Sequence, residues 1–379
     1  MIFGLSMNCI TYPLDVEYCT KEAPRLLGRI LRSYDSIVLS EQDKKKILDL
    51  GTSSIIYAGL HRSYLDVFST CPRFLLEGLP FPRPIAGNNL MTPWMRPLMK
   101  RFSTFDLPKW GPIVIERNNR DPDYLETFCR EIENLLREDQ SILAFLEIEI
   151  EEHGQRKTFR TGRSYSGRVR RFASSLLTPA INVSKEGKKV YIVPISFSYD
   201  FVSEEKNFQK LTRADHFKRS SHSLVSSLGR LYYMFVECRY FSKMYGLGRG
   251  NVYIDVGEPI LVDPATPKKE LAGRAQKEAA RCSRVTMPAL VCYAINQGAG
   301  TRDEIKESIE KLNEVLVRKK LNFQNSPDWK ATTDLALDGL VERKIVSNGL
   351  EVMKKRPDIV TYYANTIAHH FEPDEVPLP

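Results

Sequence analysis

The chain has 379 residues, of which 42% are hydrophobic and 27% are charged. This is the balance of a globular protein with enough apolar content to bury a core, at a length of roughly two or three domains. The formal net charge is +8. Such a charge favours anionic partners, among them nucleic acid, anionic lipid head groups and phosphorylated small molecules.

Cysteine usage and apolar runs exclude several classes of protein. The seven cysteines are odd in number and none forms a C-x-x-C pair, so we predict reduced cysteines and neither a disulfide framework nor a zinc site. The start, "MIFGLSMNCITYPLD", lacks the basic leader of a signal peptide. No apolar run approaches the roughly 18 to 20 residues of a membrane helix. We therefore expect a cytoplasmic protein that is soluble or peripheral on a membrane.

The first predicted elements are helices. Residues 15–50 carry apolar positions at helical spacing, and a second helix within them is capped by Ser40 and stops at Gly51. Apolar runs bounded by glycine or proline then alternate with helical stretches, of which 121–139 is the strongest. The expected strands are 53–60, 84–87, 111–118, 141–150, 188–200 and 250–260.

Strands that alternate with helices predict an α/β fold with a mixed central sheet flanked by helices. After "DPATPKKE" the pattern changes to helices, which include 301–320 and 333–346. We predict three parts in this chain. They are an N-terminal helical segment at 1–50, an α/β domain at 51–265 and a C-terminal helical region at 266–379.

Several familiar motifs are missing or incomplete. No G-x-x-x-x-G-K-[ST] run exists, and "GLGRGN" at 246–251 lacks the dinucleotide spacing and is expected to form a turn. His369 and His370 are adjacent, so they face different directions and do not suit a shared metal. Basic runs such as "GRVRR" carry no recognised nucleic-acid motif. We expect no metal and no nucleic-acid partner.

The stretch "GLHRSYLDVF" at 59–68 holds a histidine and an aspartate five positions apart. On one straight helix these side chains would lie about 140° apart and would not meet. If His61 ends the strand and Asp66 lies in the first turn of the next helix, they can meet. The carboxylate would then orient the ring while the imidazole accepts a proton from a hydroxyl. The alternative is a helix start with a buried histidine and an acidic cap.

Three further stretches offer groups for a phosphate. Arg117 in "GPIVIERN" follows a strand end, where α/β sheets bind ligands, and can clamp a phosphate; a surface ion pair is the alternative. "TGRSYSGR" at 161–168 combines Arg163, Ser164 and Arg168 with two glycines. Pro194 in "YIVPISFSYD" removes a ladder donor, which predicts a strand end beside a cleft or else a plain bulge.

The order "HRSYLD", "GPIVIERN", "FLE…GRSYSGR", "IVPISFSYD" resembles the four blocks of the glycerolipid acyltransferases. Those blocks run roughly H-R-S-x-x-D, G-x-[IVF]-x-[IVF]-x-R, F-x-E-G-x-R-S-R-x-G-[KR] and [IV]-P-[IV]-x-[IV]-x-Y. The greatest similarity is to glycerol-3-phosphate acyltransferases of the bacterial membrane-associated type and to dihydroxyacetone-phosphate acyltransferases. It spans about 55–371, where "VTYYANTIAHHF" resembles a C-terminal helix of the family.

This resemblance implies the glycerolipid acyltransferase fold and a role for each matching residue. His61 would be the general base and Asp66 its partner. Pro194 would lie by the acyl thioester. The residues implied to bind the phosphorylated acceptor are Arg62, Ser63, Arg117, Gly162, Arg163 and Ser164.

The third block departs from the family pattern. Glu147 stands where its glutamate belongs, after "LAFL", but residues 148–161 intervene before Gly162, and Tyr165 replaces the usual second arginine. Either an extension is inserted after Glu147, or the block starts at Phe159. We prefer the insertion because "LAFLE" is typical of a strand. Glu147 then stays a candidate for the acceptor site.

The resemblance implies acyl transfer from acyl-CoA or acyl-ACP to the sn-1 hydroxyl of glycerol 3-phosphate, the first step of phospholipid synthesis, without a cofactor. Dihydroxyacetone phosphate and lysophosphatidic acid are alternative acceptors, and a non-catalytic lipid-surface protein is the alternative class. The positive charge also suits peripheral contact with an anionic membrane on its cytoplasmic face. Amphipathic stretches at 25–33 and 228–248 are candidates for that contact; the alternative is that both pack on the sheet.

Overall fold

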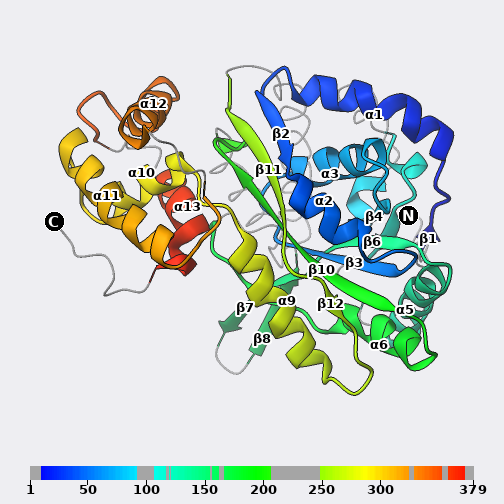
Figure 1. Cartoon of the computed structure of the whole chain (residues 1–379). Coiled ribbons are helices and arrows are strands. Elements are labelled where there is room, and N and C mark those ends of the chain that lie inside the picture. Colours follow the sequence, from blue (N-terminus) through cyan, green and yellow to red (C-terminus); the bar gives the residue numbers. More distant parts are fainter. Residues whose placement is uncertain are drawn as a thin grey trace, which may run out of the picture.

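A nine-stranded mixed sheet forms the centre of the protein, whose structure is a computed structural model (Figure 1). The residues that it describes are 10–91, 106–116, 119, 121–153, 156–161, 166–205, 248–323, 328–351 and 357–371. The strand order is β1-β5-β4-β6-β3-β10-β11-β2, with β12 paired to β10. The bounds are β1 Ile10–Thr11, β2 Ser36–Leu39, β3 Ser54–Gly59, β4 Pro82–Gly87, β5 Ile113–Ile115, β6 Ser141–Phe145, β10 Val190–Tyr199, β11 Asn251–Val256 and β12 Ile260–Leu261.

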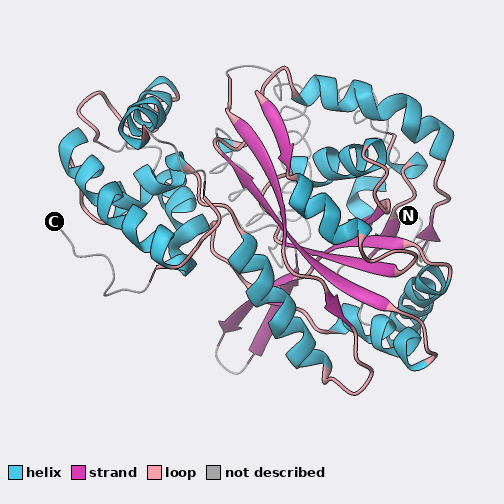
Figure 2. Ribbon diagram, viewed as in Figure 1, coloured by secondary structure: helices cyan, strands magenta, loops and turns pink. Residues whose placement is uncertain are grey.

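Helices cover both faces of this sheet (Figure 2). One face carries α1 (Val16–Ile30), α2 (Glu41–Leu48) and α3 (Leu65–Leu76), and the other carries α5 (Pro122–Arg137), α6 (Thr178–Lys185) and α9 (Lys268–Cys282). The central strand β3 is buried along its whole length. Tyr57 points into the core beneath α1, α2 and α3, and Ile56 points into the core beneath α5, α6 and α9. Successive side chains of a strand alternate between faces in this way. The predicted mixed sheet with flanking helices is confirmed.

The N-terminal segment contributes to the sheet as well as to a helical layer. α1 and α2 form where helices were expected, capped by Asp15 and Ser40. Between them the four-residue strand β2 pairs in parallel with β11, and β1 pairs with β5. The expectation that residues 15–50 are wholly helical is therefore wrong at 36–39. The division of the chain at residues 50 and 265 stays a prediction.

The insertion in the third block forms a β-hairpin. The expected strand at 141–150 is two strands: β6 stays in the main sheet, and β7 (Glu147–His153) leaves it. β7 pairs with β8 (Arg156–Thr161) and with β9 (Arg171–Phe172) in a separate three-stranded sheet. Leu146 is the single residue between β6 and β7, so Glu147 stays at the end of the main sheet.

Pro194 does not end its strand. β10 runs without a break from Val190 to Tyr199, and Pro194 lies opposite Ala58 of β3. Its missing N–H falls where β10 changes partners, since β12 pairs with β10 at Tyr191 and Ile192 and β11 pairs with it from Ile195 onward. The proline is tolerated there because no ladder donor is needed at the gap between two partner strands. The predicted strand end at Pro194 is therefore wrong.

A group of helices stands beside the sheet at the C-terminal end of the described chain (Figure 1). These helices are α10 (Met287–Asn296), α11 (Arg302–Arg318), α12 (Trp329–Glu342) and α13 (Pro357–Ile367). A capping box between Thr301 and Glu304 starts α11. The remaining short helices are η1 (Asn88–Met91), η2 (Leu107–Lys109), η3 (Ser175–Leu177) and η5 (Ala368–His370).

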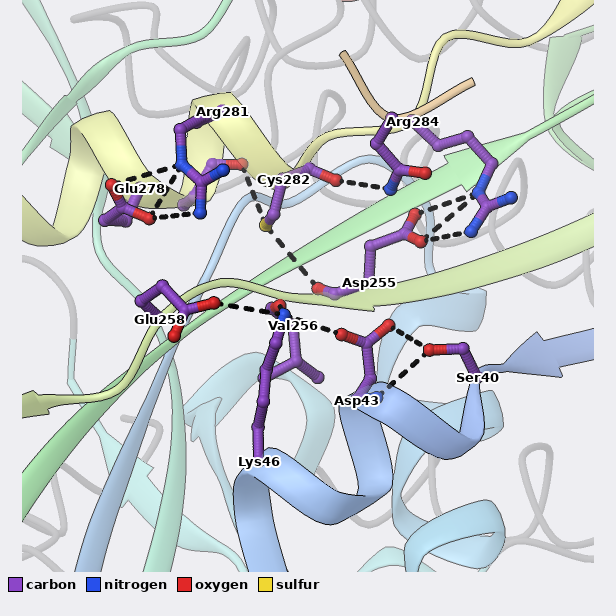
Figure 3. Close-up of polar contacts among 12 residues, drawn as sticks. Ser40, Asp43, Lys46, Asp255, Val256, Glu258, Glu278, Arg281, Cys282 and Arg284 are labelled. Carbon is purple, nitrogen blue, oxygen red and sulfur yellow. Dashed lines mark hydrogen bonds and ion pairs between the residues drawn. The ribbon is translucent and has the colours of Figure 1, made fainter. Parts of the chain in front are cut away.

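Charged side chains fasten β11 to helices on both faces of the sheet (Figure 3). Lys46 of α2 lies 3.0 Å from Asp43 and 3.5 Å from Glu258, and it donates to a backbone carbonyl of β11. Arg284, which follows α9, lies 2.7 Å from Asp255 of β11. We call these five residues the β11 ion-pair cluster. It joins three segments that lie far apart in the sequence.

Within the described ranges, no helix is both long and apolar enough to span a bilayer. The amphipathic stretch at 25–33 belongs to α1 and the turn after it. Its apolar residues Leu26, Leu27 and Ile30 are buried in the core, and Leu31 is exposed. The apolar side of this segment therefore packs against the rest of the protein, which was the alternative to membrane contact. The stretch at 228–248 lies outside the described residues, apart from Gly248.

Candidate active site

The loop between β3 and α3 lies at the edge of the sheet where parallel strands end. β3 is parallel to its neighbours β6 and β10, so their carboxyl ends meet at that edge, where α/β sheets bind ligands. His61 follows β3 after one residue, and Asp66 lies in the first turn of α3. We call residues 60–66 the His61 loop.

His61 and Asp66 form a hydrogen-bonded pair. The distance from His61 Nδ1 to Asp66 Oδ2 is 2.8 Å. The Asp66 side chain is fully buried, whereas the imidazole is 14% exposed. Because the carboxylate only accepts, Nδ1 carries the proton and Nε2 is the acceptor of the neutral ring. In the part of the chain that the structure describes, Nε2 has no hydrogen-bond partner. This ring can therefore take a proton at Nε2.

Four donors hold the Asp66 carboxylate. Besides His61, the backbone N–H groups of Arg62 and Ser63 donate to Oδ2 at 2.7 and 3.0 Å, and the Tyr199 hydroxyl donates to Oδ1 at 2.5 Å. Burial, followed by the negative charge of Asp66, raises the pKa of Tyr199 well above its usual value, so this hydroxyl stays protonated. The donors satisfy the acceptor capacity of an ionised carboxylate and fix the loop around it.

Glu147 holds the other side of the His61 loop. Its Oε2 accepts the backbone N–H of His61 at 2.7 Å, and its Oε1 accepts that of Arg170 at 3.1 Å. The Arg62 guanidinium lies 3.6 Å from Oε1, and both side chains are buried. Glu147 therefore lies in the site, beside the backbone of the histidine. Its observed contacts within the described residues are to this chain's own groups.

An aromatic ring covers one face of the imidazole. Phe145 stacks on His61 with ring centroids 4.1 Å apart and planes at 22°. The close packing requires Gly59, because a Cβ there would lie 3.0 Å from the Phe145 ring. The last residue of β3 thus makes room for the ring that orients the histidine.

Arg62 and Ser63 point into the protein. Arg62 is 2% exposed, and its Nη atoms have no hydrogen bond to any described residue. It lines a hollow of about 20 Å³ together with residues of α13, which is room for a water but not for a phosphate. The buried hydroxyl of Ser63 donates to Glu204 at 2.9 Å. Both side chains are buried, and the expectation that they line the acceptor stays a prediction.

The remaining candidate residues fall into two groups. Arg117, Gly162, Arg163 and Ser164 lie outside the described residues, although Arg117 follows β5, which is parallel to β4 and ends at the same edge. Arg168 is described and exposed. Pro194 is buried in β10, five residues before Tyr199 at the end of that strand. Its proposed place beside a thioester stays a prediction.

The sequence reasoning missed three groups that hold the His61 loop. Tyr199 is the final tyrosine of the fourth block, so the family pattern contained a signal for it. Glu204 accepts the backbone N–H of Tyr64 at 2.8 Å, and Tyr362 donates to the Arg62 carbonyl at 3.0 Å. Both come from distant segments. Glu204 had no signal, whereas Tyr362 lies in the stretch that resembles a C-terminal helix of the family. Among the described residues, no cluster of His, Cys, Asp and Glu suits a metal.

Comparisons with known proteins agree on an acyltransferase. Residues 37–198 match the Acyltransferase family. A curated glycerol-3-phosphate acyltransferase of Actinobacillus succinogenes is 24% identical over 94% of this chain and 44% of its own length. Another, of Pseudoalteromonas atlantica, is 25% identical over 92% of this chain and 43% of its own length. The chain thus spans less than half the length of these relatives.

Among solved structures, the 1-acyl-sn-glycerophosphate (LPA) acyltransferase PlsC from Thermotoga maritima is 15% identical, with a TM-score of 0.35. The match covers 69% of this chain and 78% of that one. A likeness this weak supports no conclusion about fold or activity. The match to the Acyltransferase family at 37–198 contains the His61–Asp66 pair and Glu147, and so the chain carries an acyltransferase domain.

Proposed function

We propose that the protein transfers a fatty acyl group from acyl-CoA or acyl-ACP to the sn-1 hydroxyl of glycerol 3-phosphate, with His61 as general base. The observation that carries this proposal is the 2.8 Å contact between His61 Nδ1 and Asp66 Oδ2. It leaves Nε2 as the ring nitrogen without a hydrogen-bond partner among the described residues. A buried carboxylate behind an accessible imidazole is the arrangement that activates a hydroxyl.

The reaction needs one proton to move out and back. His61 Nε2 accepts the proton of the acceptor hydroxyl as its oxygen attacks the thioester carbonyl carbon. The resulting tetrahedral intermediate collapses, the carbon–sulfur bond breaks, and the thiolate recovers the proton from His61. Asp66 stabilises the imidazolium between these two steps. No covalent enzyme intermediate is formed, and no cofactor is consumed.

The choice of glycerol 3-phosphate as acceptor rests on the names of the two relatives, both glycerol-3-phosphate acyltransferases. At 24% and 25% identity these relatives support the class of reaction more strongly than the acceptor. Dihydroxyacetone phosphate and lysophosphatidic acid offer the same hydroxyl and phosphate chemistry and are the alternative acceptors. The proposed site for the phosphate is formed by Arg117, Arg163 and Ser164, with Gly162 permitting close approach.

We propose that the protein acts at the cytoplasmic face of a membrane, to which it binds peripherally. The substrates suggest it, because long-chain acyl products partition into bilayers. The net charge of +8 favours contact with anionic lipids.

A transfer assay with radiolabelled acceptors tests the proposal. The purified chain is incubated with acyl-CoA or acyl-ACP and each of the three acceptors in turn. We expect product with glycerol 3-phosphate at the highest kcat/KM. A higher kcat/KM with dihydroxyacetone phosphate or lysophosphatidic acid would show that this compound is the acceptor. Binding to anionic liposomes without turnover for any acceptor would instead favour a non-catalytic lipid-surface protein.

Arg117→Ala tests the site for the phosphate. Loss of a bidentate phosphate contact costs roughly 1.5 to 3 kcal/mol, so we expect the KM for glycerol 3-phosphate to rise by about tenfold or more. The KM for the acyl donor should stay constant, because the donor does not use this arginine. Steady-state kinetics with each substrate varied separately checks this. A change confined to the acyl-donor KM would show that the assignment of Arg117 is wrong.

A further inference from the structure

The C-terminal helix α13 makes direct contact with the His61 loop. The hydroxyl of Tyr362 donates to the backbone carbonyl of Arg62 at 3.0 Å, across 300 positions of sequence. Tyr362 is 1% exposed. We propose that Tyr362 is a positioning residue for the His61–Asp66 pair, so that the C-terminal helices take part in building the active site.

The contact falls on a peptide unit that also holds Asp66. The carbonyl of Arg62 and the N–H of Ser63 belong to one planar peptide. Its oxygen accepts from Tyr362, and its N–H donates to Asp66 Oδ2 at 3.0 Å. Fixing the oxygen therefore fixes the direction of the N–H. A hydrogen bond to the oxygen also polarises the peptide and strengthens its donor. The same Oδ2 receives His61 Nδ1.

The same helix also holds the segment that follows the third block. Asn365 donates to the carbonyl of Ser166 at 2.8 Å. Gly167, which has a φ of +77°, lies so close to α13 that a Cβ there would be 2.1 Å from the Tyr362 carbonyl oxygen. Three residues later, the N–H of Arg170 donates to Glu147, which holds the His61 backbone. α13 thus contacts the site from two directions.

α13 is itself fixed by buried polar contacts. The hydroxyl of Tyr363 donates to Glu205 at 3.2 Å and accepts the N–H of Val202 at 2.9 Å. Arg343, which follows α12, lies 3.0 Å from Glu205. Glu204 is the next residue back and accepts the Ser63 hydroxyl. The helix is therefore held by buried segments other than the His61 loop.

Hydrogen exchange tests the contact without any measurement of activity. Tyr362→Phe removes only the hydroxyl. The matched control is Tyr57→Phe, because Tyr57 is equally buried and its hydroxyl also donates to one backbone carbonyl, that of Pro80 at 3.1 Å. We expect amide exchange in residues 60–66 to accelerate about fivefold in Tyr362→Phe, the equivalent of one ordinary hydrogen bond. Exchange in this segment should stay at the wild-type rate in Tyr57→Phe.

Kinetics supplies the second measurement, which rests on the proposed function. Small misplacement of a catalytic group costs up to about a hundredfold in rate, and we expect kcat to fall about tenfold in Tyr362→Phe. The KM of the acceptor should stay within twofold, because Tyr362 lies behind the loop. Tyr57→Phe should keep kcat within twofold. Both variants are compared with wild type at temperatures equally far below their own melting temperatures, so that a difference in global stability does not enter.

The two proposals fail in different ways. Unchanged exchange at 60–66 in Tyr362→Phe would overturn the positioning role, whatever the enzyme's activity. Equal acceleration in Tyr57→Phe would overturn it as well, since the effect would then be general loosening. A wild-type protein without transferase activity would overturn the proposed function, while the exchange result would still decide whether Tyr362 fixes the loop.

Discussion

The His61 loop and the β11 ion-pair cluster are both built around buried carboxylates, but different groups face those carboxylates. In the β11 ion-pair cluster, Asp255 faces Arg284 at 2.7 Å and Asp43 faces Lys46 at 3.0 Å. Asp66 faces an imidazole, two backbone N–H groups and a tyrosine hydroxyl. Arginine and lysine stay protonated at neutral pH, whereas an imidazole gains and loses its proton. Only the His61 loop can therefore move a proton.

The cost of burial also differs between the two regions. Desolvation raises the pKa of Asp255, although Arg284 acts in the opposite direction. The attraction of the arginine thus does not fully offset the loss of water, as is common for buried ion pairs. The β11 ion-pair cluster contributes by joining α2, β11 and the segment after α9, and its loss is costly because it would leave a charge unpaired. A buried charged cluster is thus no sign of catalysis unless one partner titrates near neutral pH.

The largest expected effect is that of His61→Ala on turnover. General-base help is worth about 10²- to 10⁴-fold in rate, so we expect kcat to fall more than a hundredfold. The ring packs on Phe145 but carries no backbone contact, so the fold should remain intact, with an unchanged circular dichroism spectrum. Acyl transfer to glycerol 3-phosphate measures the loss. Near-normal turnover would show that His61 is not the general base. The proposed difference in function between the His61 loop and the β11 ion-pair cluster would then be wrong.

Asp255→Asn tests the opposite region. It leaves Arg284 largely buried without its counter-charge, and we expect stability to fall by about 2 to 3 kcal/mol, measured by urea unfolding. The kcat should stay within twofold, because the pair lies away from the His61 loop. The control is Asp334→Asn, since Asp334 faces Lys306 and Arg302 at an exposed position and should cost under about 0.5 kcal/mol. Equal losses for both variants would show that burial of the pair does not matter.

The sequence predicted the elements that have strong local patterns. β3, α5 and β10 appear where apolar runs and capping residues placed them. The strand β2 was missed because four residues between two helices carry too little periodicity. Pro194 was misread because its tolerance depends on which strands pair with β10 on either side of it. That information lies in the tertiary structure, outside the strand itself.

The site was predictable where it is local. His61 and Asp66 are five positions apart, so spacing and the resemblance to a family brought them together. Glu204 and Tyr362 lie 141 and 300 positions from their partners in the His61 loop. Nothing in the sequence around a glutamate or a tyrosine says which distant backbone it will contact. The groups that hold the His61 loop from distant segments are therefore harder to predict than the His61–Asp66 pair within it.

His370 is a second histidine of interest, because it lies near a positive charge, whereas His61 lies beside a carboxylate. It is buried, it lies 3.1 Å from the Ser283 carbonyl, and its own backbone carbonyl accepts from Lys319. Burial, together with the positive charge of Lys319, lowers the pKa of His370 to about 4. Below pH 6.5 the unfolded chain takes up a proton that the folded protein refuses until about pH 4. Stability should therefore fall as the pH falls through this range.

His370→Gln should remove that part of the pH dependence. Because each pH unit is worth up to about 1.4 kcal/mol per group, the wild type should lose about 1.5 kcal/mol between pH 6.5 and pH 5 through this histidine, and the variant should not. Glutamine can still donate to the Ser283 carbonyl. Urea unfolding at both pH values measures the difference. Parallel pH profiles for wild type and His370→Gln would contradict the prediction.

Phe145→Leu should have the smallest effect and tests how far the imidazole depends on its aromatic cover. Leucine keeps an apolar side chain beside Gly59 but loses the stacked contact at 4.1 Å, which is worth about 0.5 to 1.5 kcal/mol. We expect kcat to fall about threefold to tenfold, because the ring samples orientations in which Nε2 points away from the acceptor. The control is Phe74→Leu, which removes an edge-on contact with Tyr57 in the core and should lower stability but leave kcat within twofold. If both variants lowered kcat equally, the loss would come from the core, and the hydrogen bonds to Asp66 alone would suffice to orient His61.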